Sequence, residues 1–372
     1  MGGTVLITGG AGFIGSHVAD ELLVHGYRVR ILDALSPQIH AGLESWPEYL
    51  ASTVEPIEGD VRDPKAVGRA LDGVDSVLHL AAMVGVGQSM YQVTDYVAVN
   101  DLGTAVLLQA LIEQPVARLV VASSRSIYGE GLYRECDGRI VEDAARGVHQ
   151  LRRGSWEALD REGRPLEPLP TPETKRPALA SVYALNKYVQ ERMCLLVGEA
   201  YRIPTVALRF FNVFGPRQAL SNPYTGVLAI FAARLLNGNP PLIFEDGRQR
   251  RDFVDVRDVA RACRLALEAE HAPGHAINVG SGRSYTVREI ARRLTQLLGR
   301  PEIEPEITGR FRAGDISHCF ADLALARDLL GYRCEIDLDS GLVTLADWLS
   351  SQIAVDNVDQ ATRELAVRGL VA

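Results

Sequence analysis

The stretch TGGAGFIGS, residues 8–16, connects an apolar run to an amphipathic one. TVLIT at 4–8 has the composition of a buried strand, and FIGSHVADELLVHG at 13–26 has apolar residues at helical spacing. Gly9 permits a tight turn, Gly12 allows a pyrophosphate to approach the backbone, and Gly15 allows helix and sheet to pack closely. The stretch therefore predicts a strand–turn–helix unit that binds a dinucleotide; a glycine turn without a ligand is the alternative.

The cofactor is indicated by the next strand, RVRILD at 28–33, which ends in Asp33. A carboxylate at this place can accept hydrogen bonds from the ribose diol of an adenosine. Ala34 follows, so no arginine adjacent to Asp33 is available to hold the 2′-phosphate of NADP. We therefore expect NAD.

Further apolar runs alternate with helical stretches through the first half of the chain. Strands are expected at 54–60, 75–82, 118–124 and 205–211, and helices near 64–72, 91–114 and 181–202. Short strands separated by helices are typical of a parallel, doubly wound α/β sheet. The remainder, with helices near 224–238, 256–269, 286–298 and 338–351, indicates a smaller second domain partly interleaved with the first.

Two segments stand apart from this alternation. Residues 130–180 are rich in Arg, Glu, Gly and Pro, and they include RPLEPLPTPETKRP at 164–177. We predict a long ordered insertion or lid; a flexible linker is the alternative. Residues 351–372 indicate a final amphipathic helix, for which packing or an oligomer contact is the expected role.

The composition excludes several classes of protein. The 372 residues are 47% apolar and 23% charged, as in ordinary globular proteins. A net charge of −8, from 39 basic and 47 acidic residues, argues against nucleic acid or an anionic membrane as a partner. The N-terminal apolar run is too short for a signal peptide or a membrane span. Five scattered cysteines without a CxxC pair indicate reduced thiols in the cytoplasm, and no metal site is expected.

A candidate catalytic group lies in SVYALNKYVQE, where Tyr183 and Lys187 are one helical turn apart on one face. A neighbouring ammonium favours the phenolate, so we expect a lowered pKa for Tyr183 and a role as base near neutral pH. Such a pair alone is common on helices. Its weight comes from the glycine turn and from Ser124, which ends the strand RLVVASS at 118–124.

The order of the motifs resembles that of a known family. TGGAGFIGS, GDVRD, HLAA, SSRSIYG, YALNK, LRFFNVFGP, RRDFVDVRDVA and RAGDISHCFAD follow one another as in the extended short-chain dehydrogenases/reductases, in the nucleotide-sugar epimerase/dehydratase branch. The resemblance implies a Rossmann domain for NAD, a smaller α/β domain for a nucleoside-diphosphate sugar, and a homodimer formed through 91–114 and 183–202. The expected bounds are 1–212 with 243–272 for the first domain, 213–242 with 273–350 for the second, and 351–372 for a helical tail.

By position, the resemblance implies the catalytic triad Ser124, Tyr183 and Lys187. It implies NAD contacts at Gly9, Gly12, Phe13, Ile14, Gly15, Asp33, Asp60, Val61, Leu80, Ala81, Ala82, Asn100, Tyr183, Lys187 and Phe210, with Phe211 also near the nicotinamide. It implies substrate contacts at Ser124, Arg125, Ser126, Asn212, Val227, Arg251, Arg312 and Asp315. For Arg251, a surface salt bridge with Asp252, Asp255 or Asp258 is the alternative.

Arg125 and Ser126 separate the members of this branch. The 4,6-dehydratases have an Asp-Glu pair at these positions, which supplies acid and base for the loss of water. An arginine stays charged and cannot donate a proton at neutral pH. Small residues are usual there in 4-epimerases, so Ser126 fits and Arg125 departs in size. Arg125 is expected to pin the insertion through an acidic residue or to reach the sugar; a structural ion pair is the alternative.

The expected reaction is epimerisation at C4, as in the dTDP-L-rhamnose 4-epimerase-like and UDP-glucose 4-epimerase-type proteins that the chain most resembles. Tyr183 takes the proton of the 4-hydroxyl, Ser124 holds that oxygen, and Lys187 supports Tyr183. Hydride moves from C4 to NAD, and the 4-keto sugar accepts it back on its other face. A dehydratase or 4-ketoreductase of the same fold remains an alternative, as does an NAD-binding sensor or scaffold without catalysis.

Overall fold

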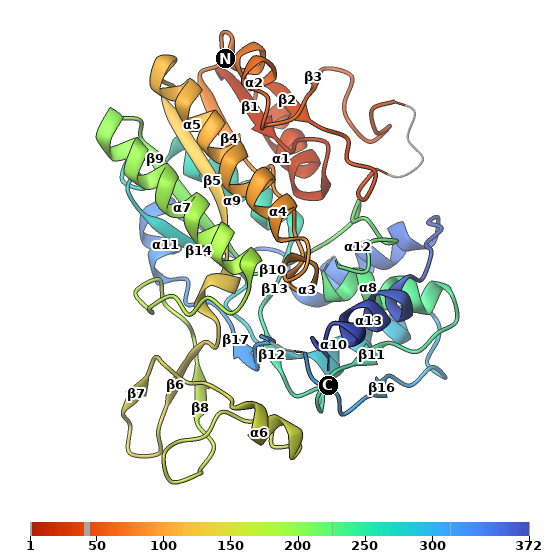
Figure 1. The fold of residues 1–372 in the computed structure, drawn as a ribbon. Coiled ribbons are helices and arrows are strands. Elements are labelled where there is room, and N and C mark those ends of the chain that lie inside the picture. The colour runs from red at the N-terminus through yellow and green to blue at the C-terminus, as the bar shows by residue number, and fades with distance from the viewer. Residues whose placement is uncertain (1, 41–44, 225, 313, 372) are drawn as a thin grey trace.

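The computed structural model describes residues 2–40, 45–224, 226–312 and 314–371. Seven parallel strands form its central sheet (Figure 1). Their order across the sheet is β14 (Ala276–Val279), β9 (Thr205–Phe210), β5 (Arg118–Ser124), β4 (Ser76–His79), β1 (Thr4–Thr8), β2 (Arg28–Asp33) and β3 (Glu55–Glu58). The chain starts near the middle and winds outward in both directions, so the predicted doubly wound α/β sheet is confirmed.

Helices cover both faces of this sheet. On one face, α1 (Phe13–Val24) packs against α9 (Val256–Glu268), through a core that includes Val18, Leu22 and Val259. On the other face lie α2 (Pro64–Leu71), α5 (Gly103–Glu113) and α7 (Val182–Tyr201), whose apolar residues pack with Leu6 and Leu32. Both faces of the inner strands are therefore buried, which accounts for their continuous apolar runs.

The predicted helix near 91–114 contains a conformational change that periodicity did not indicate. Its helical backbone consists of α4 (Val93–Tyr96), a π-helical segment η1 (Val97–Leu102) and α5. The short helix α3 (Val86–Ser89) precedes it. A π-helical segment carries an additional residue per turn and changes the direction of the side chains within it.

A smaller α/β part lies beside the sheet. Helices α8 (Val227–Leu236), α10 (Val287–Leu297) and α12 (Leu338–Leu349) share a second apolar core. Short strands pair here: β10 (Asn212–Phe214) with β13 (Phe253–Asp255), β11 (Leu242–Ile243) with β16 (Glu306–Ile307), and β12 (Arg250–Arg251) with β15 (Tyr285–Thr286) and β17 (His318–Cys319). The last helix, α13 (Val358–Val367), buries Val358, Ala361 and Leu365.

One expected domain boundary is wrong. The expected bounds place residues 273–350 in the smaller domain, but β14 within them pairs with β9 in the central sheet. α11 (Ala324–Leu330) packs against β14 and α9, and its Ala326 and Leu330 belong to the core of that sheet. A four-residue strand at the end of the sheet has too short an apolar run to show which sheet it joins.

The segment between β5 and α7 has ordered structure of its own. It begins with the 3₁₀ turn η2 (Arg125–Tyr128) and contains β6 (Leu132–Arg134), β7 (Ile140–Val141), α6 (Val148–Arg152) and β8 (Glu167–Leu169). β6 pairs with both β7 and β8, and Tyr133, Ala158 and Leu166 form a small core. Figure 1 shows these elements together, away from the central sheet. We call residues 130–180 the insertion.

Within the part of the chain that the structure describes, no helix has both the length and the apolar character needed to cross a membrane.

Candidate active site

Two cavities meet at the carboxyl ends of the central strands. The first, about 660 Å³, extends from the glycine turn along Asp33 and Asp60 to Tyr183. The second, about 420 Å³, lies between the central sheet and the smaller part of the molecule. Ser124, Tyr183 and Phe211 are among the residues that line both. In doubly wound folds, ligands bind at this edge of the sheet, so we call the two the cofactor cavity and the substrate cavity.

The glycine turn has a conformation that only glycine fits. Gly9 has φ +71°, in the left-handed region that glycine adopts readily. A Cβ on Gly15 would lie 2.3 Å from the Gly9 carbonyl oxygen and 2.7 Å from the Gly10 Cα, both of them backbone atoms. α1 can therefore begin close under the turn only because residue 15 lacks a side chain. Its first peptide N–H groups lie beside the cofactor cavity, where they favour a pyrophosphate.

Two backbone N–H groups fix the Asp33 carboxylate beside the cofactor cavity. Its carboxylate accepts hydrogen bonds from the backbone N–H of Ala11 (3.0 Å) and of Leu35 (2.9 Å), and it lines the cofactor cavity. Arg62 also lines this cavity, but its guanidinium is paired with Asp60 at 2.6 Å and holds the pKa of that carboxyl below its usual range. The side chains present fit an adenosine diol better than a 2′-phosphate.

Most of the residues expected to contact the cofactor lie together. Gly9, Gly12, Phe13, Ile14, Gly15, Asp33, Asp60, Val61, Leu80, Ala81, Ala82, Tyr183, Lys187, Phe210 and Phe211 all line the cofactor cavity. Asn100 is the exception. It is fully buried in η1, its amide Nδ2 donates to the Met83 carbonyl (3.1 Å), and its Oδ1 accepts from the Met83 N–H (2.7 Å). Asn100 therefore holds the Leu80–Val84 segment and does not face the cavity.

The triad is assembled from two elements. Ser124 ends β5, and its hydroxyl caps η2 by accepting from the Ser126 N–H at 3.1 Å. Tyr183 and Lys187 lie in the first two turns of α7, whose N-terminus is capped by Ser181. The Tyr183 N–H is also fixed, because it donates to the Ser89 hydroxyl at 3.0 Å. Ser124 and Tyr183 thus meet where the two cavities join, and Lys187 lines the cofactor cavity.

The expectation that the pKa of Tyr183 is lowered is wrong. Burial raises the pKa of Tyr183, while the Ser124 hydroxyl and the charge of Arg125 act in the opposite direction. Lys187 does not contribute to that shift: its Nζ donates to the Ala122 carbonyl at 3.0 Å, and burial lowers the Lys187 pKa to about 8. Helical spacing alone could not show that both groups are desolvated.

The substrate cavity brings together every residue expected to bind substrate. Its lining includes Ser124, Arg125, Ser126, Asn212, Val227, Arg251, Arg312 and Asp315. Several of its buried polar atoms have no hydrogen-bond partner among the described residues: a terminal nitrogen of Arg125, the Ser126 hydroxyl, Asn212 Oδ1, Gln218 Oε1 and Gln249 Oε1. Buried polar atoms are rarely left unpaired, so this set indicates a polar ligand.

The expected alternatives for two arginines are wrong. Arg251 makes no ion pair with Asp252, Asp255 or Asp258; its guanidinium donates to the carbonyls of Arg250, Ser317 and Ile316. Asp255 and Asp258 pair instead with Arg257 and Arg261. Within the described ranges Arg125 forms no ion pair: one of its terminal nitrogens has no hydrogen-bond partner, and Glu130 is paired with Arg146. The expectation that Arg125 pins the insertion through an acidic residue is therefore wrong, and so is the alternative of a structural ion pair. Burial and the nearby Arg125 lower the pKa of Arg251 to about 10.

The sequence did not indicate one wall of the substrate cavity. Val358, Ala361 and Leu365 of α13 line it, although they lie near the end of the chain. Glu364 anchors the helix, because its carboxylate accepts from the hydroxyls of Tyr91 (3.2 Å) and Tyr224 (3.3 Å). The amphipathic pattern predicted a helix here, but nothing in that pattern shows what the apolar face covers.

The described residues contain no group of three or more His, Cys, Asp or Glu side chains placed to hold a metal ion.

Several known proteins are similar to this chain in sequence and in structure. The model of the NAD dependent epimerase/dehydratase family matches residues 5–149 and 159–280. A dTDP-L-rhamnose 4-epimerase of Burkholderia thailandensis is 34% identical, over 95% of this chain and 96% of its own length. The UDP-glucose 4-epimerase of Thermotoga maritima, solved with UDP-glucose, has a TM-score of 0.75 and 30% identity over 93% of this chain and 98% of that one. That of Thermus thermophilus, solved with NAD, has a TM-score of 0.72 and 30% identity over 94% of this chain and 100% of that one.

The chain belongs to the NAD-dependent epimerase/dehydratase family, which the glycine turn, Asp33 and the Ser124–Tyr183–Lys187 group had indicated. Its cofactor is NAD.

Proposed function

We propose that this protein interconverts the C4 epimers of a nucleoside-diphosphate sugar. The observation that carries the proposal is the place of Ser124 and Tyr183, which line both the cofactor cavity and the substrate cavity. A hydroxyl group of a sugar in the second cavity can therefore meet the phenol of Tyr183 beside the cofactor. The residues that line the cofactor cavity, among them Gly12, Asp33 and Lys187, would hold NAD, which would supply the hydride chemistry at C4 of the sugar.

The protein's own groups handle the proton and the oxygen. Tyr183 takes the proton from the 4-hydroxyl, and Ser124 donates a hydrogen bond to the resulting carbonyl oxygen. Burial raises the pKa of Tyr183, so the opposing influence of Ser124 and Arg125 helps it to act as a base. Lys187 is held by the Ala122 carbonyl near the cofactor cavity. After the 4-keto sugar turns over, Tyr183 gives the proton back.

The acids around the site argue against loss of water. Asp315 is the one carboxylate among the described residues that line the substrate cavity, and its Oδ2 is paired with Arg312 at 2.9 Å. Glu130 accepts from the Ser317 N–H and the Tyr133 hydroxyl, and Glu135 pairs with Arg139. Elimination of water needs a base at C5 and an acid at C6, and the described residues that line the substrate cavity offer no unpaired carboxyl group for either role.

We expect no deuterium on carbon when the reaction runs in D₂O. An epimerase moves hydride between C4 and NAD, and the hydroxyl proton exchanges without trace. The test incubates the enzyme with a panel of nucleoside-diphosphate sugars in D₂O, followed by mass spectrometry and proton NMR. An isomer of unchanged mass with an altered C4 coupling pattern supports the proposal.

Three other outcomes of the same incubation would contradict it. A product lighter by one water, with deuterium at C5, identifies a dehydratase. A product that appears only with added NADH or NADPH and a 4-keto sugar identifies a ketoreductase. No turnover of any sugar, by protein that still contains NAD, identifies a binding protein without catalysis.

Arg125 and Arg251 are proposed to bind an anionic group of the substrate, because two partly buried arginines that line the substrate cavity stand near each other and neither forms an ion pair within the described ranges. We expect Arg125→Met to raise KM roughly 10- to 150-fold, which corresponds to loss of a charge-assisted hydrogen bond of about 1.5–3 kcal/mol. Steady-state kinetics measure the effect. Arg250→Met is the control, since Arg250 is an exposed neighbour on β12 and is outside both cavities. An unchanged KM for the Arg125 variant would contradict this role.

A homodimer is proposed from the apolar residues left exposed on adjacent helices. Val93, Val97 and Leu102 are exposed on α4 and η1, and Leu185 and Leu196 are exposed on α7. Neighbouring exposed apolar side chains mark an interaction surface. We expect twice the chain's mass in size-exclusion chromatography with light scattering, and the monomer mass for Leu196→Arg. A monomeric wild type would contradict this proposal.

The cytoplasm is the proposed location. Support comes from the five cysteines, all of which are free thiols. Proteins exported to an oxidising compartment usually pair such residues.

A further inference from the structure

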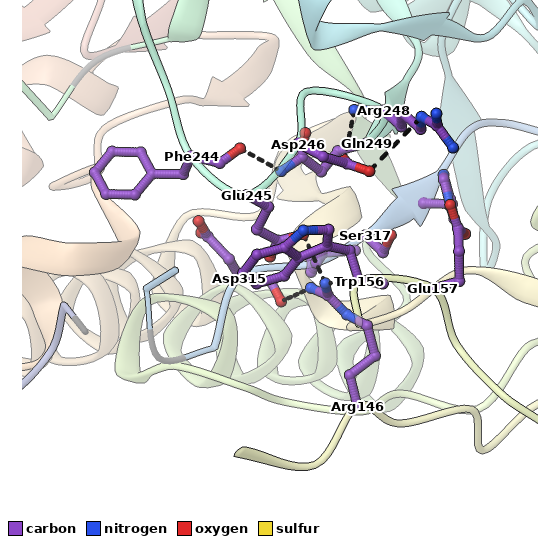
Figure 2. Close-up of polar contacts among 12 residues, drawn as sticks. Arg146, Trp156, Glu157, Phe244, Glu245, Asp246, Arg248, Gln249, Asp315 and Ser317 are labelled. Atoms are coloured by element: carbon purple, nitrogen blue, oxygen red, sulfur yellow. Dashed lines mark hydrogen bonds and ion pairs between the residues drawn. The ribbon is translucent and has the colours of Figure 1, made fainter. Parts of the chain in front are cut away.

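The insertion contains one buried arginine side chain, which joins Glu130 and Trp156 of the insertion itself to two other segments of the chain. Arg146 is nearly inaccessible to solvent, and its guanidinium donates four hydrogen bonds. They run to Glu130 Oε1 (2.9 Å), the Trp156 carbonyl (3.1 Å), Glu245 Oε2 (2.7 Å) and the Asp315 carbonyl (2.9 Å). Figure 2 shows this side chain reaching from the insertion toward Glu245 and Asp315. The planar fork of an arginine is well suited to fix several acceptors at once.

Glu245 has a backbone conformation that is unusual for a residue other than glycine. Its φ is +56°, in the left-handed region that non-glycine residues rarely adopt. Its carboxylate is almost completely buried, and Arg146 is the cation paired with it. Its backbone N–H donates to the Arg310 carbonyl at 2.7 Å. A buried carboxylate in a disfavoured backbone conformation persists only where its surroundings hold it, and such positions cluster at functional sites.

Glu130 joins the same cluster from the other side. It lies just after η2, and its carboxylate accepts from the backbone N–H of Ser317 (2.8 Å) and from the Tyr133 hydroxyl (2.7 Å). Arg146 therefore links the segment that follows the catalytic Ser124 to the strand that follows Asp315. Two carboxylates share one guanidinium, so the loss of Arg146 would leave both without a counter-charge.

The segments that Arg146 holds form part of the substrate cavity. Phe244 directly precedes Glu245, and Gln249 follows it by four residues. Both line the cavity, and the Gln249 amide donates to the Phe244 carbonyl at 2.8 Å. Arg312 and Asp315 line it as well, and the Arg312 guanidinium lies 4.5 Å from the centre of the Phe244 ring. Figure 2 shows Phe244, Gln249 and Asp315 around the Arg146–Glu245 contact. Arg146 itself does not line the cavity, so it can act on a ligand only through these residues.

We propose that Arg146 is a positioning residue. Through Glu245 and the Asp315 carbonyl, it fixes the two loops that hold Phe244, Gln249, Arg312 and Asp315. The insertion thereby sets the affinity for the nucleoside diphosphate of the substrate. The inference rests on the proposed function, because it takes the substrate cavity to bind a nucleoside-diphosphate sugar. Tyr183 and Ser124 are not touched by this cluster. Loss of the Arg146–Glu245 contact should therefore weaken binding of the nucleoside diphosphate without lowering kcat.

The test compares variants at position 245 in the full-length protein. Glu245→Gly and Glu245→Ala both remove the anchor, but only glycine is comfortable at φ +56°. Glu245→Gln keeps an acceptor for Arg146. UDP, dTDP, GDP and CDP serve as probes in isothermal titration calorimetry, with KM and kcat measured for a sugar nucleotide that the wild type converts. Bound NAD and the melting temperature are recorded for each variant. Arg139→Met is the control, because Arg139 is an exposed arginine of the same insertion.

We expect both Glu245→Gly and Glu245→Ala to weaken binding of the preferred nucleoside diphosphate by about tenfold or more. KM should rise by the same factor as the dissociation constant, while kcat and the NAD content of both variants stay within about threefold of the wild type. The Arg139→Met control should stay within the same range of the wild type in each of these quantities. Glu245→Gln should bind nearly as the wild type does. Arg146→Met should weaken binding as strongly; if that variant does not fold, the position 245 series carries the test.

Two results would overturn the inference alone. One is normal binding by Glu245→Gly with weak binding by Glu245→Ala, because backbone strain and not the anchor would then explain the loss. The other is a fall in kcat at unchanged KM. Wild-type protein that binds none of the four nucleotides would overturn this inference together with the proposed substrate class.

Discussion

Replacing Tyr183 by Phe is expected to reduce turnover by about 10²–10⁴-fold, the usual loss when a general base is removed. The ring should keep its place at the start of α7, because the hydrogen bond to the Ser89 hydroxyl comes from the Tyr183 backbone N–H, which the substitution leaves unchanged. Only the oxygen that exchanges a proton with the sugar is lost. Turnover is measured with the sugar nucleotide that the wild type converts.

A matched control is available on the same helix. Tyr188 lies one residue beyond Lys187, is partly buried against the core of the central sheet and does not line either cavity. Tyr188→Phe should keep turnover within about threefold, since it removes no group from the site. A Tyr183→Phe enzyme within tenfold of the wild type would mean that another group acts as the base.

Replacing Gly15 by Ala is expected to yield protein that has lost most of its NAD. The new Cβ would lie 2.3 Å from the Gly9 carbonyl oxygen and 2.7 Å from the Gly10 Cα. Both atoms belong to backbone, so the turn and the start of α1 must move apart. The pyrophosphate site depends on the placing of that turn. The nucleotide released by denaturing purified protein can be identified and counted, with less than roughly one-tenth of the wild-type NAD expected.

Gly68→Ala provides the comparison within a helix. Gly68 lies in α2, and a Cβ there meets no atom within 4 Å. Alanine should keep the NAD content and raise the free energy of unfolding by about 0.5–1 kcal/mol, because it has the higher helix propensity. Normal NAD in the Gly15 variant would contradict the account of the turn. Release of mainly NADP from the wild type would contradict the role given to Asp33.

Arg125 and Asn100 show that the position of a residue in a motif does not determine where its side chain points. Both were expected at the site. Arg125 lies in the substrate cavity with a buried nitrogen lacking a partner in the described ranges, whereas Asn100 turns both ends of its amide to the Met83 backbone. A motif states which residue type occurs at a position, but the direction of the Asn100 side chain depends on η1, and a π-helical segment has no clear signal in hydrophobic spacing.

Patterns of neighbouring residues were enough to predict the local geometry of the cofactor site. A strand followed by a glycine turn and a helix, an Asp at the end of the next strand, and Tyr183 one turn before Lys187 are all patterns of local backbone geometry. Tertiary structure alone decided which distant segments meet. Arg146 and Glu245 are 99 residues apart in the sequence, α13 closes a cavity that begins at Ser124, and burial raises the pKa of Tyr183 against the local expectation. The physical reason is that desolvation and charge pairing depend on everything that surrounds a group, and periodicity along the chain describes only its nearest neighbours.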